Sequence, residues 1–298
     1  MTLTLLDGDL ALTITPERGA EACSLEVDGV ELLYQAPWPP QPLPPDPVDA
    51  TPWELAWHGG WQLLWPNAGS PCTVGGVEHG FHGAGSIAPF EVIESAPAHA
   101  MLRCAIGGLV CERSFEVRDG AVRASARIRN ESTTNVPLIV VEHLILGGAL
   151  AVEGTSIELA GGHAIGQSWD GVPLLPGEPW PELAGDDLSI LPGVTSRFVV
   201  VRDLAAGEVH VTSPTGLSLD VRFDRSAFPH LWLWEERLCA TVEPWSGRGE
   251  CLAIEPSSVP STDGLGGAVE RGEAIVLLPG ESFESWCELA PRPDRSDA

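Results

Sequence analysis

The sequence predicts an all-β protein built as one large antiparallel sandwich. Short stretches in which apolar and polar residues alternate recur along the chain, and Gly, Pro, Asp and Asn residues separate them. No window has the long amphipathic period of a helix. Many short strands joined by turn residues are typical of a sandwich.

The first strands are predicted close to the N-terminus. Three apolar residues alternate with smaller or polar ones between positions 10 and 14, as in a strand with one buried face. Asp28-Gly29 then separates two apolar stretches at 25–27 and 30–32. An Asp-Gly pair suits a tight turn, so this segment predicts a hairpin.

Later segments repeat this pattern. Asp119-Gly120 separates strands predicted over 115–117 and 122–128. The turn at 214–216 separates strands at 209–211 and 217–223 in the same way. Near the end, apolar residues at 274–278 lead through Pro279-Gly280 to a further stretch at 283–289.

Two segments interrupt the strands. Residues 35–53 contain so many prolines that they cannot form a central strand, and residues 175–187 are rich in Pro, Gly and acidic residues. Long ordered loops of this kind are either pocket walls and lids or plain surface excursions. No linker or internal repeat divides the chain, so residues 1–298 are predicted to form a single domain.

Composition excludes several classes of partner. The formal charge of −26 would repel nucleic acid and anionic membranes, whereas a neutral sugar would not be affected. A soluble surface, or an acidic or salty habitat, also accounts for this charge. Seven cysteines without a Cys-x-x-Cys pair indicate small buried residues in a reducing compartment. With no signal-peptide pattern at the N-terminus, we expect a cytoplasmic protein.

Candidate acid and base groups lie in three places. His79 and His82 fall in a glycine-rich turn, where the backbone can approach a ligand closely. His143 follows a strand of apolar residues that would hold it rigidly, as a proton donor requires. Glu255 also follows an apolar run, and a carboxylate there is either paired or functional, because burying it alone is costly. Taken alone, the positions of His143 and Glu255 favour hydrogen-bonded structural residues.

Other chemistries find no support in the sequence. His79 and His82 have no nearby set of ligands that would complete a zinc site, so no metal is predicted. A Gly-x-Ser-x-Gly elbow, a P-loop and a dinucleotide fingerprint are all absent. Most of the eleven tryptophans are expected to fill the core, with one or two lining a site where sugar C–H faces can stack.

The order of these motifs resembles the aldose 1-epimerase (galactose mutarotase-like) superfamily. The resemblance rests on Gly59-Gly60 through Gly69, His79-Gly80-Phe81, Asn130 with His143, and Glu255-Pro256 ahead of a Pro-Gly turn. It implies a β-supersandwich with an open sugar cleft, and an isomerase of carbohydrate metabolism that interconverts the α and β anomers of a sugar. It also implies that His143 is the acid, Glu255 the base and His79 a substrate-positioning residue, with no cofactor.

This chain departs from the superfamily near the two glycines. The superfamily has an arginine there, and this chain has Trp57-His58, which makes a sugar phosphate a less attractive substrate. His82 could replace part of the hydrogen bonding of that arginine. The secondary candidates for the cleft are His82, Asn67, Trp61 and Trp234.

Two alternatives to an epimerase remain. The first is a carbohydrate-binding protein on the same fold that lacks turnover. The second is a glycoside hydrolase, which needs a second carboxylate facing Glu255. Glu142 and the pair Glu235-Glu236 are the candidates for it, but Glu142 is expected to point away from His143, because neighbouring residues of a strand face opposite sides.

Overall fold

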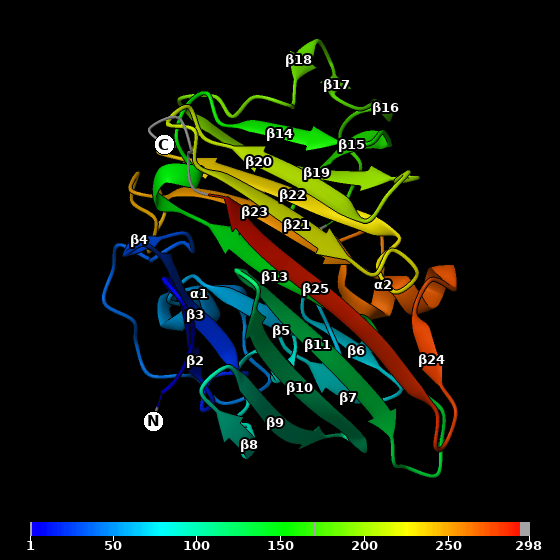
Figure 1. Ribbon diagram of the computed structural model, residues 1–298. Coiled ribbons are helices and arrows are strands. Elements are labelled where there is room, and N and C mark those ends of the chain that lie inside the picture. Colours follow the sequence, from blue (N-terminus) through cyan, green and yellow to red (C-terminus); the bar gives the residue numbers. More distant parts are fainter. Residues whose placement is uncertain (1, 170, 293–298) are drawn as a thin grey trace.

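Two large antiparallel sheets pack face to face in the computed structural model, which describes residues 2–169 and 171–292 (Figure 1). Side chains from both sheets form the main apolar core between them. The prediction of an all-β antiparallel sandwich is confirmed.

The larger sheet carries the residues from which the candidate site is built. Its 11 strands run in the order β1 (Leu3–Asp7), β2 (Leu10–Thr15), β3 (Glu21–Val27), β5 (Trp61–Leu64), β13 (Val141–Leu146), β23 (Glu250–Ser257), β22 (His230–Arg237), β19 (Thr195–Arg202), β15 (His163–Gln167) and β16 (Glu178–Pro179), with β4 (Val30–Glu31) paired to β3.

The second sheet has 8 strands. They run in the order β14 (Ser156–Leu159), β20 (Glu208–Thr212), β21 (Ser218–Phe223), β25 (Ser282–Arg292), β11 (Ala121–Asn130), β10 (Leu109–Arg118), β9 (His99–Ile106) and β8 (Glu91–Ala96). Three two-stranded sheets complete the set: β12 (Val136–Leu138) with β24 (Ile275–Leu277), β17 (Glu182–Leu183) with β18 (Asp186–Asp187), and β6 (Cys72–Val74) with β7 (Val77–His79).

The three hairpins predicted from turn residues form as expected. Strand β3 pairs with β4 around Asp28-Gly29, β10 with β11 around Asp119-Gly120, and β20 with β21 around residues 214–216. The two strands near the end of the chain also form, but they do not pair with each other. Strand β24 pairs with β12, while β25 lies between β21 and β11.

Two short helices were not predicted. Helix α1 (Ala50–Ala56) begins inside the proline-rich segment, and α2 (Gly264–Arg271) ends at Gly272 in the left-handed conformation that glycine favours. Both are too short to show a helical period in the sequence. Across the described part of the chain, no helix is long and apolar enough to cross a membrane.

A buried ion pair lies between the two sheets. Arg113 of β10 donates to both carboxylate oxygens of Glu142 on β13, over 2.6 and 2.7 Å, and the indole nitrogen of Trp61 donates to the same carboxylate over 2.8 Å. Arg113 and Glu142 have 1% and 0% of their side chains exposed. Glu142 therefore faces the core, and its neighbour His143 must face the opposite side of the larger sheet.

The cysteines follow the predicted pattern only in part. All seven are free, and four of them are buried: Cys104, Cys111, Cys251 and Cys287. Cys23 and Cys72 are half-buried, and Cys239 is exposed.

Candidate functional site

A cavity of about 300 Å³ opens on the face of the larger sheet that is turned away from the smaller sheet. Its floor comes from β13, β22 and β23, and α1 with the segment around residues 81–82 forms one wall. Both predicted catalytic residues, His143 and Glu255, line it. The volume is at the lower end of the range of small-molecule sites.

His143 and Glu255 lie directly opposite each other on neighbouring strands. The register pairs Val141 with Ser257 and Leu144 with Ile254, which sets residue 143 against residue 255. Directly opposed residues of an antiparallel pair have Cβ atoms about 4.5–5.5 Å apart and point to the same face. The two side chains are therefore neighbours on the cavity floor.

Burial favours the neutral forms of both groups. It lowers the pKa of His143 to about 3 and raises the pKa of Glu255 well above its usual value. Each residue is only 3% exposed. The desolvation of two buried ions outweighs the attraction between them.

His82 lines the cavity beside His143, with ring centroids 5.0 Å apart. Its Nδ1 accepts the backbone N–H of Gly69 over 3.1 Å, so the neutral ring carries its proton on Nε2. Burial, and secondly the neighbouring His143, lower the pKa of His82 well below its usual value. His82 therefore offers the cavity an N–H donor.

The contact between His82 and residue 69 depends on glycine. Gly69 has a φ of +77°, and a Cβ atom there would lie 2.1 Å from the carbonyl oxygen of Thr262. We expected the glycines around His79 and His82 to let the backbone approach a ligand. Here the glycine instead lets two chain segments approach each other.

Aromatic rings form most of the remaining wall. Trp57, Trp234 and Trp245 contact one another, with centroid distances of 5.3 to 6.4 Å. The other aromatic residues that line the cavity are Trp53, Phe81, Trp169, Phe198 and Trp232. The buried indole nitrogens of Trp57 and Trp234 have no partner within the described residues. Such a wall fits the apolar face of a sugar ring.

Two further carboxyl groups line the cavity, of which Glu54 was not predicted and Glu236 was considered only as the second carboxylate of a hydrolase. Glu54 lies on α1, and burial raises its pKa to about 7 although an interaction with Trp245 opposes the shift. Glu236 lines the cavity from β22 and accepts the backbone N–H groups of Cys239 and Ala240 over 2.9 and 2.8 Å. The one sequence signal that could have identified Glu54 is its position between Trp53 and Trp57.

The position of Glu236 disfavours a hydrolase. Trp232, not Glu236, is the partner of Glu255, and Glu236 lies four residues further along the strand. At about 3.3 Å per residue the backbone positions of Trp232 and Glu236 are roughly 13 Å apart, so Glu236 does not face Glu255 across the strand pair. Glu142 faces the core, as expected, and Glu235 is paired with Arg197.

Three predicted site residues do not line this cavity. Trp61 is fully buried in the core between the sheets, where its indole N–H donates to the carboxylate of Glu142. Asn67 is fully buried. Its amide nitrogen donates to the carbonyl oxygens of Ser70 and Gly80, and its amide oxygen accepts the backbone N–H of Leu265. His79, on β7, lies at a separate depression with Cys72 and Gly80, where burial lowers its pKa.

The position of His79 outside the cavity has a physical reason. Residue 79 ends a short strand, and the chain reverses at residues 80–83. Phe81 and His82 thus turn into the cavity while His79 stays outside it.

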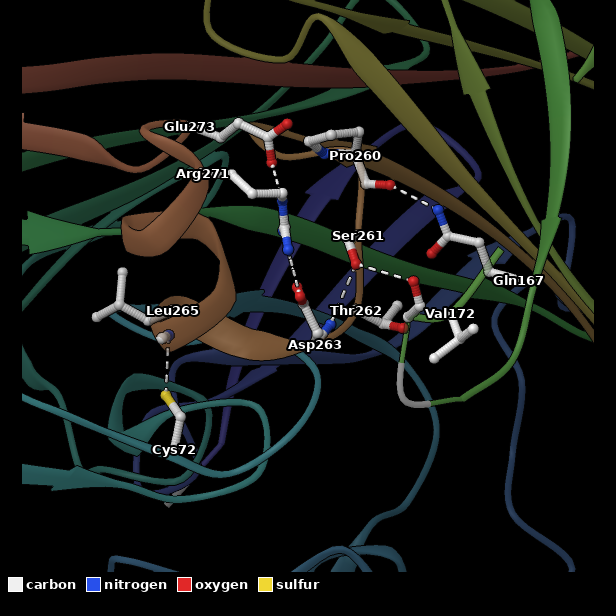
Figure 2. A network of polar contacts seen from close by, with 12 residues as sticks. Cys72, Gln167, Val172, Pro260, Ser261, Thr262, Asp263, Leu265, Arg271 and Glu273 are labelled. Atoms are coloured by element: carbon white, nitrogen blue, oxygen red, sulfur yellow. Dashed lines mark hydrogen bonds and ion pairs between the residues drawn. The ribbon is translucent and has the colours of Figure 1, made fainter. Parts of the chain in front are cut away.

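A polar network holds the rim of the cavity (Figure 2). Gln167 donates to the carbonyl oxygen of Pro260 over 2.8 Å, and Ser261 donates to that of Gly171 over 3.3 Å. Thr262 donates to the carbonyl oxygen of Trp169 over 3.2 Å, and both residues line the cavity. These bonds tie the segment after β23 to the segment that carries Trp169.

Comparison with known families places the chain. Residues 2–290 match the family described as "Domain of unknown function (DUF4432)". The chain belongs to the DUF4432 family. No curated protein matches it significantly.

Solved structures share the fold of this DUF4432 member. A Synechocystis sp. PCC 6803 protein has 17% identity and a TM-score of 0.74, covering 98% of this chain and 95% of that one. A galactose mutarotase related enzyme from Lactobacillus acidophilus has 13% identity and a TM-score of 0.70, covering 99% of both chains. The GalM/aldose epimerase homologue from C. elegans has 12% identity and a TM-score of 0.69, covering 98% of both. The predicted galactose mutarotase-like fold is confirmed.

Proposed function

We propose that the protein interconverts the α and β anomers of a sugar by acid–base ring opening and closure. The observation that carries this proposal is the placement of His143 opposite Glu255 on the floor of an aromatic-walled cavity. A histidine and a carboxyl group this close can exchange two protons with one sugar ring.

Ring opening uses both groups at once. Ionised Glu255 takes the proton of the anomeric hydroxyl while protonated His143 donates a proton to the ring oxygen. The C1–O5 bond breaks with its electrons moving to O5, and the C1–O1 bond becomes a carbonyl. Glu255 is then protonated and His143 neutral. Rotation about C1–C2 and closure with the roles reversed give the other anomer.

His143 and Glu255 together hold the same number of protons before and after ring opening. Burial favours neutral His143 with protonated Glu255, which is the state that accompanies the open-chain sugar. The charged pair has to form on binding of the cyclic sugar, where hydroxyl groups and the N–H donor of His82 replace lost hydration.

Anomer exchange by NMR on freshly dissolved α-D-glucose and α-D-galactose tests this proposal. The protein should accelerate the approach to anomeric equilibrium of at least one sugar, with added chelator causing no change. Binding without acceleration would instead favour the non-catalytic carbohydrate-binding protein, for which the apolar walls suffice.

Phosphorylated sugars are expected to be poor substrates. The described lining contains no Lys or Arg and three carboxyl groups, from Glu54, Glu236 and Glu255. Burying a phosphate group without a cation to pair with it is costly. D-glucose 6-phosphate should have a kcat/KM at least about tenfold below that of D-glucose in the exchange assay. The uncharged 6-O-methyl-D-glucose separates charge from size, and equal losses for both compounds would contradict this prediction.

His82 should contribute to substrate binding and His79 should not. Removing the N–H donor with His82→Ala should raise KM by about 3- to 10-fold, the effect of one neutral hydrogen bond. His79→Ala is the matched control, because it removes a half-buried histidine outside the cavity. Saturation kinetics of anomer exchange measure both, and a larger effect for His79→Ala would reverse the assignment.

A further inference from the structure

Gln62 lies next to His143 on the side away from Glu255. Strand β5 pairs with β13 so that Gln62 is directly opposite His143. Trp61 and Glu142, which precede Gln62 and His143 on their own strands, face the core. Gln62 therefore faces the same side of the sheet as His143, and it is the one polar residue of β5.

The orientation of the Gln62 amide is fixed by its surroundings. Its Nε2 donates to the carbonyl oxygen of Ser86 over 3.3 Å. Ser86 is itself held, because its hydroxyl donates to the carbonyl oxygen of Gly83 and accepts the indole N–H of Trp53. Since the amide nitrogen must face Ser86, the Oε1 atom of Gln62 is an acceptor on the other side.

Among the described residues, neither Oε1 of Gln62 nor Nδ1 of His143 has a hydrogen-bond partner. Each residue is only 3% exposed. Buried polar atoms in proteins are nearly always hydrogen-bonded, and an unmade bond is costly. An amide oxygen and an imidazole nitrogen satisfy each other only when that nitrogen carries a proton.

We propose that Gln62 is a positioning residue that holds His143 as the Nδ1–H tautomer and leaves the Nε2 lone pair facing the cavity. A small side-chain rotation on facing residues closes the bond. His143 then exchanges protons with substrate only through Nε2. His82 has the opposite tautomer, so the cavity presents one acceptor and one donor nitrogen side by side. The tautomer follows from the two facing side chains alone, whereas its importance for turnover rests on the proposed function.

The imidazole ¹⁵N spectrum of the whole protein at pH 7 tests the tautomer without a substrate. The signals of His143 are assigned by their loss in His143→Asn. Wild type should show a protonated Nδ1 and an unprotonated Nε2, and Gln62→Met should shift His143 toward the Nε2–H tautomer. A wild-type spectrum with the proton on Nε2 would overturn the proposal.

Gln167 provides a matched control. It is also a buried glutamine whose Nε2 donates to a carbonyl oxygen and whose Oε1 has no partner within the described residues, but it lies on β15 and not opposite His143. Gln167→Met should leave the His143 tautomer unchanged, and the same shift in both variants would overturn a specific role for Gln62.

A second variant keeps the test valid if Gln62→Met does not fold. In Gln62→Glu a carboxylate faces Nδ1, which should raise the midpoint of the His143 titration followed by ¹⁵N shifts. An unchanged midpoint in folded Gln62→Glu would contradict the contact. Failure of anomer exchange in wild type with the predicted tautomer present would refute the proposed function alone.

Discussion

Replacing Glu255 with glutamine is expected to reduce catalysed anomer exchange by a factor of about 10²–10⁴, the usual contribution of one general acid–base group. Glutamine keeps the shape of the carboxyl group but cannot accept or release a proton. Exchange rates of wild type and Glu255→Gln, measured by NMR at saturating sugar, give this factor. The assay therefore tests proton transfer separately from the shape of the cavity.

The same variant is expected to keep its stability or gain some. The pKa of Glu255 is raised by burial, so the folded state binds more protons than the unfolded state above pH 4.5. This group's contribution to stability falls as pH rises from 4.5 toward the raised pKa. Glutamine has no such pH dependence. Urea unfolding should show the advantage of Glu255→Gln over wild type growing between pH 5 and pH 8.

Glu54→Gln is the matched control for both measurements. Glu54 also lines the cavity and has a pKa raised by burial, to about 7, but it does not lie opposite His143. Its removal should change the exchange rate only a few-fold. Equal losses of activity in Glu54→Gln and Glu255→Gln would show that the negative charge of the cavity matters and not a specific base. An active Glu255→Gln variant would refute the proposed mechanism.

Turn residues and the alternation of apolar with polar residues were sufficient to predict most of the fold. Asp28-Gly29 and Asp119-Gly120 connect paired strands because their tight turns require few residues and strong local preferences. Pro279-Gly280 is also a turn between two strands, but each of these strands pairs with a partner distant in sequence. Such long-range pairing is set by the core, so local patterns cannot reveal it.

The site was predictable only where strands present its residues. His143 and Glu255 follow apolar runs, and strand pairing brings them together on the cavity floor. Glu54 lies on a helix of seven residues in a proline-rich segment, which is too short for a recognisable period. His79 and His82 are three residues apart in the same turn, and only the backbone conformation at positions 80–83 decides which one enters the cavity.

The reverse face of β13 carries the largest expected effect on stability. Arg113→Met leaves the Glu142 carboxylate buried between the sheets without a cation, with only the N–H of Trp61 as its donor. Removing one partner of a buried ion pair costs about 3–5 kcal/mol. Urea unfolding at pH 7 should show a loss of this size in the free energy of unfolding.

Two further variants separate burial from charge pairing. Arg127 pairs with Glu284 over 3.3 Å on the second sheet, but 53% and 69% of these side chains are exposed. Arg127→Met should therefore cost at most about 1 kcal/mol.

The double variant Arg113→Met with Glu142→Leu should recover most of the stability, because apolar residues of similar volume often replace a buried ion pair without loss. If the double variant is as unstable as Arg113→Met, the cost arises from packing around Trp61 and not from an uncompensated charge. Because Glu142 precedes His143, full recovery of stability with loss of anomer exchange would further indicate that this ion pair holds β13 in the position that the cavity requires.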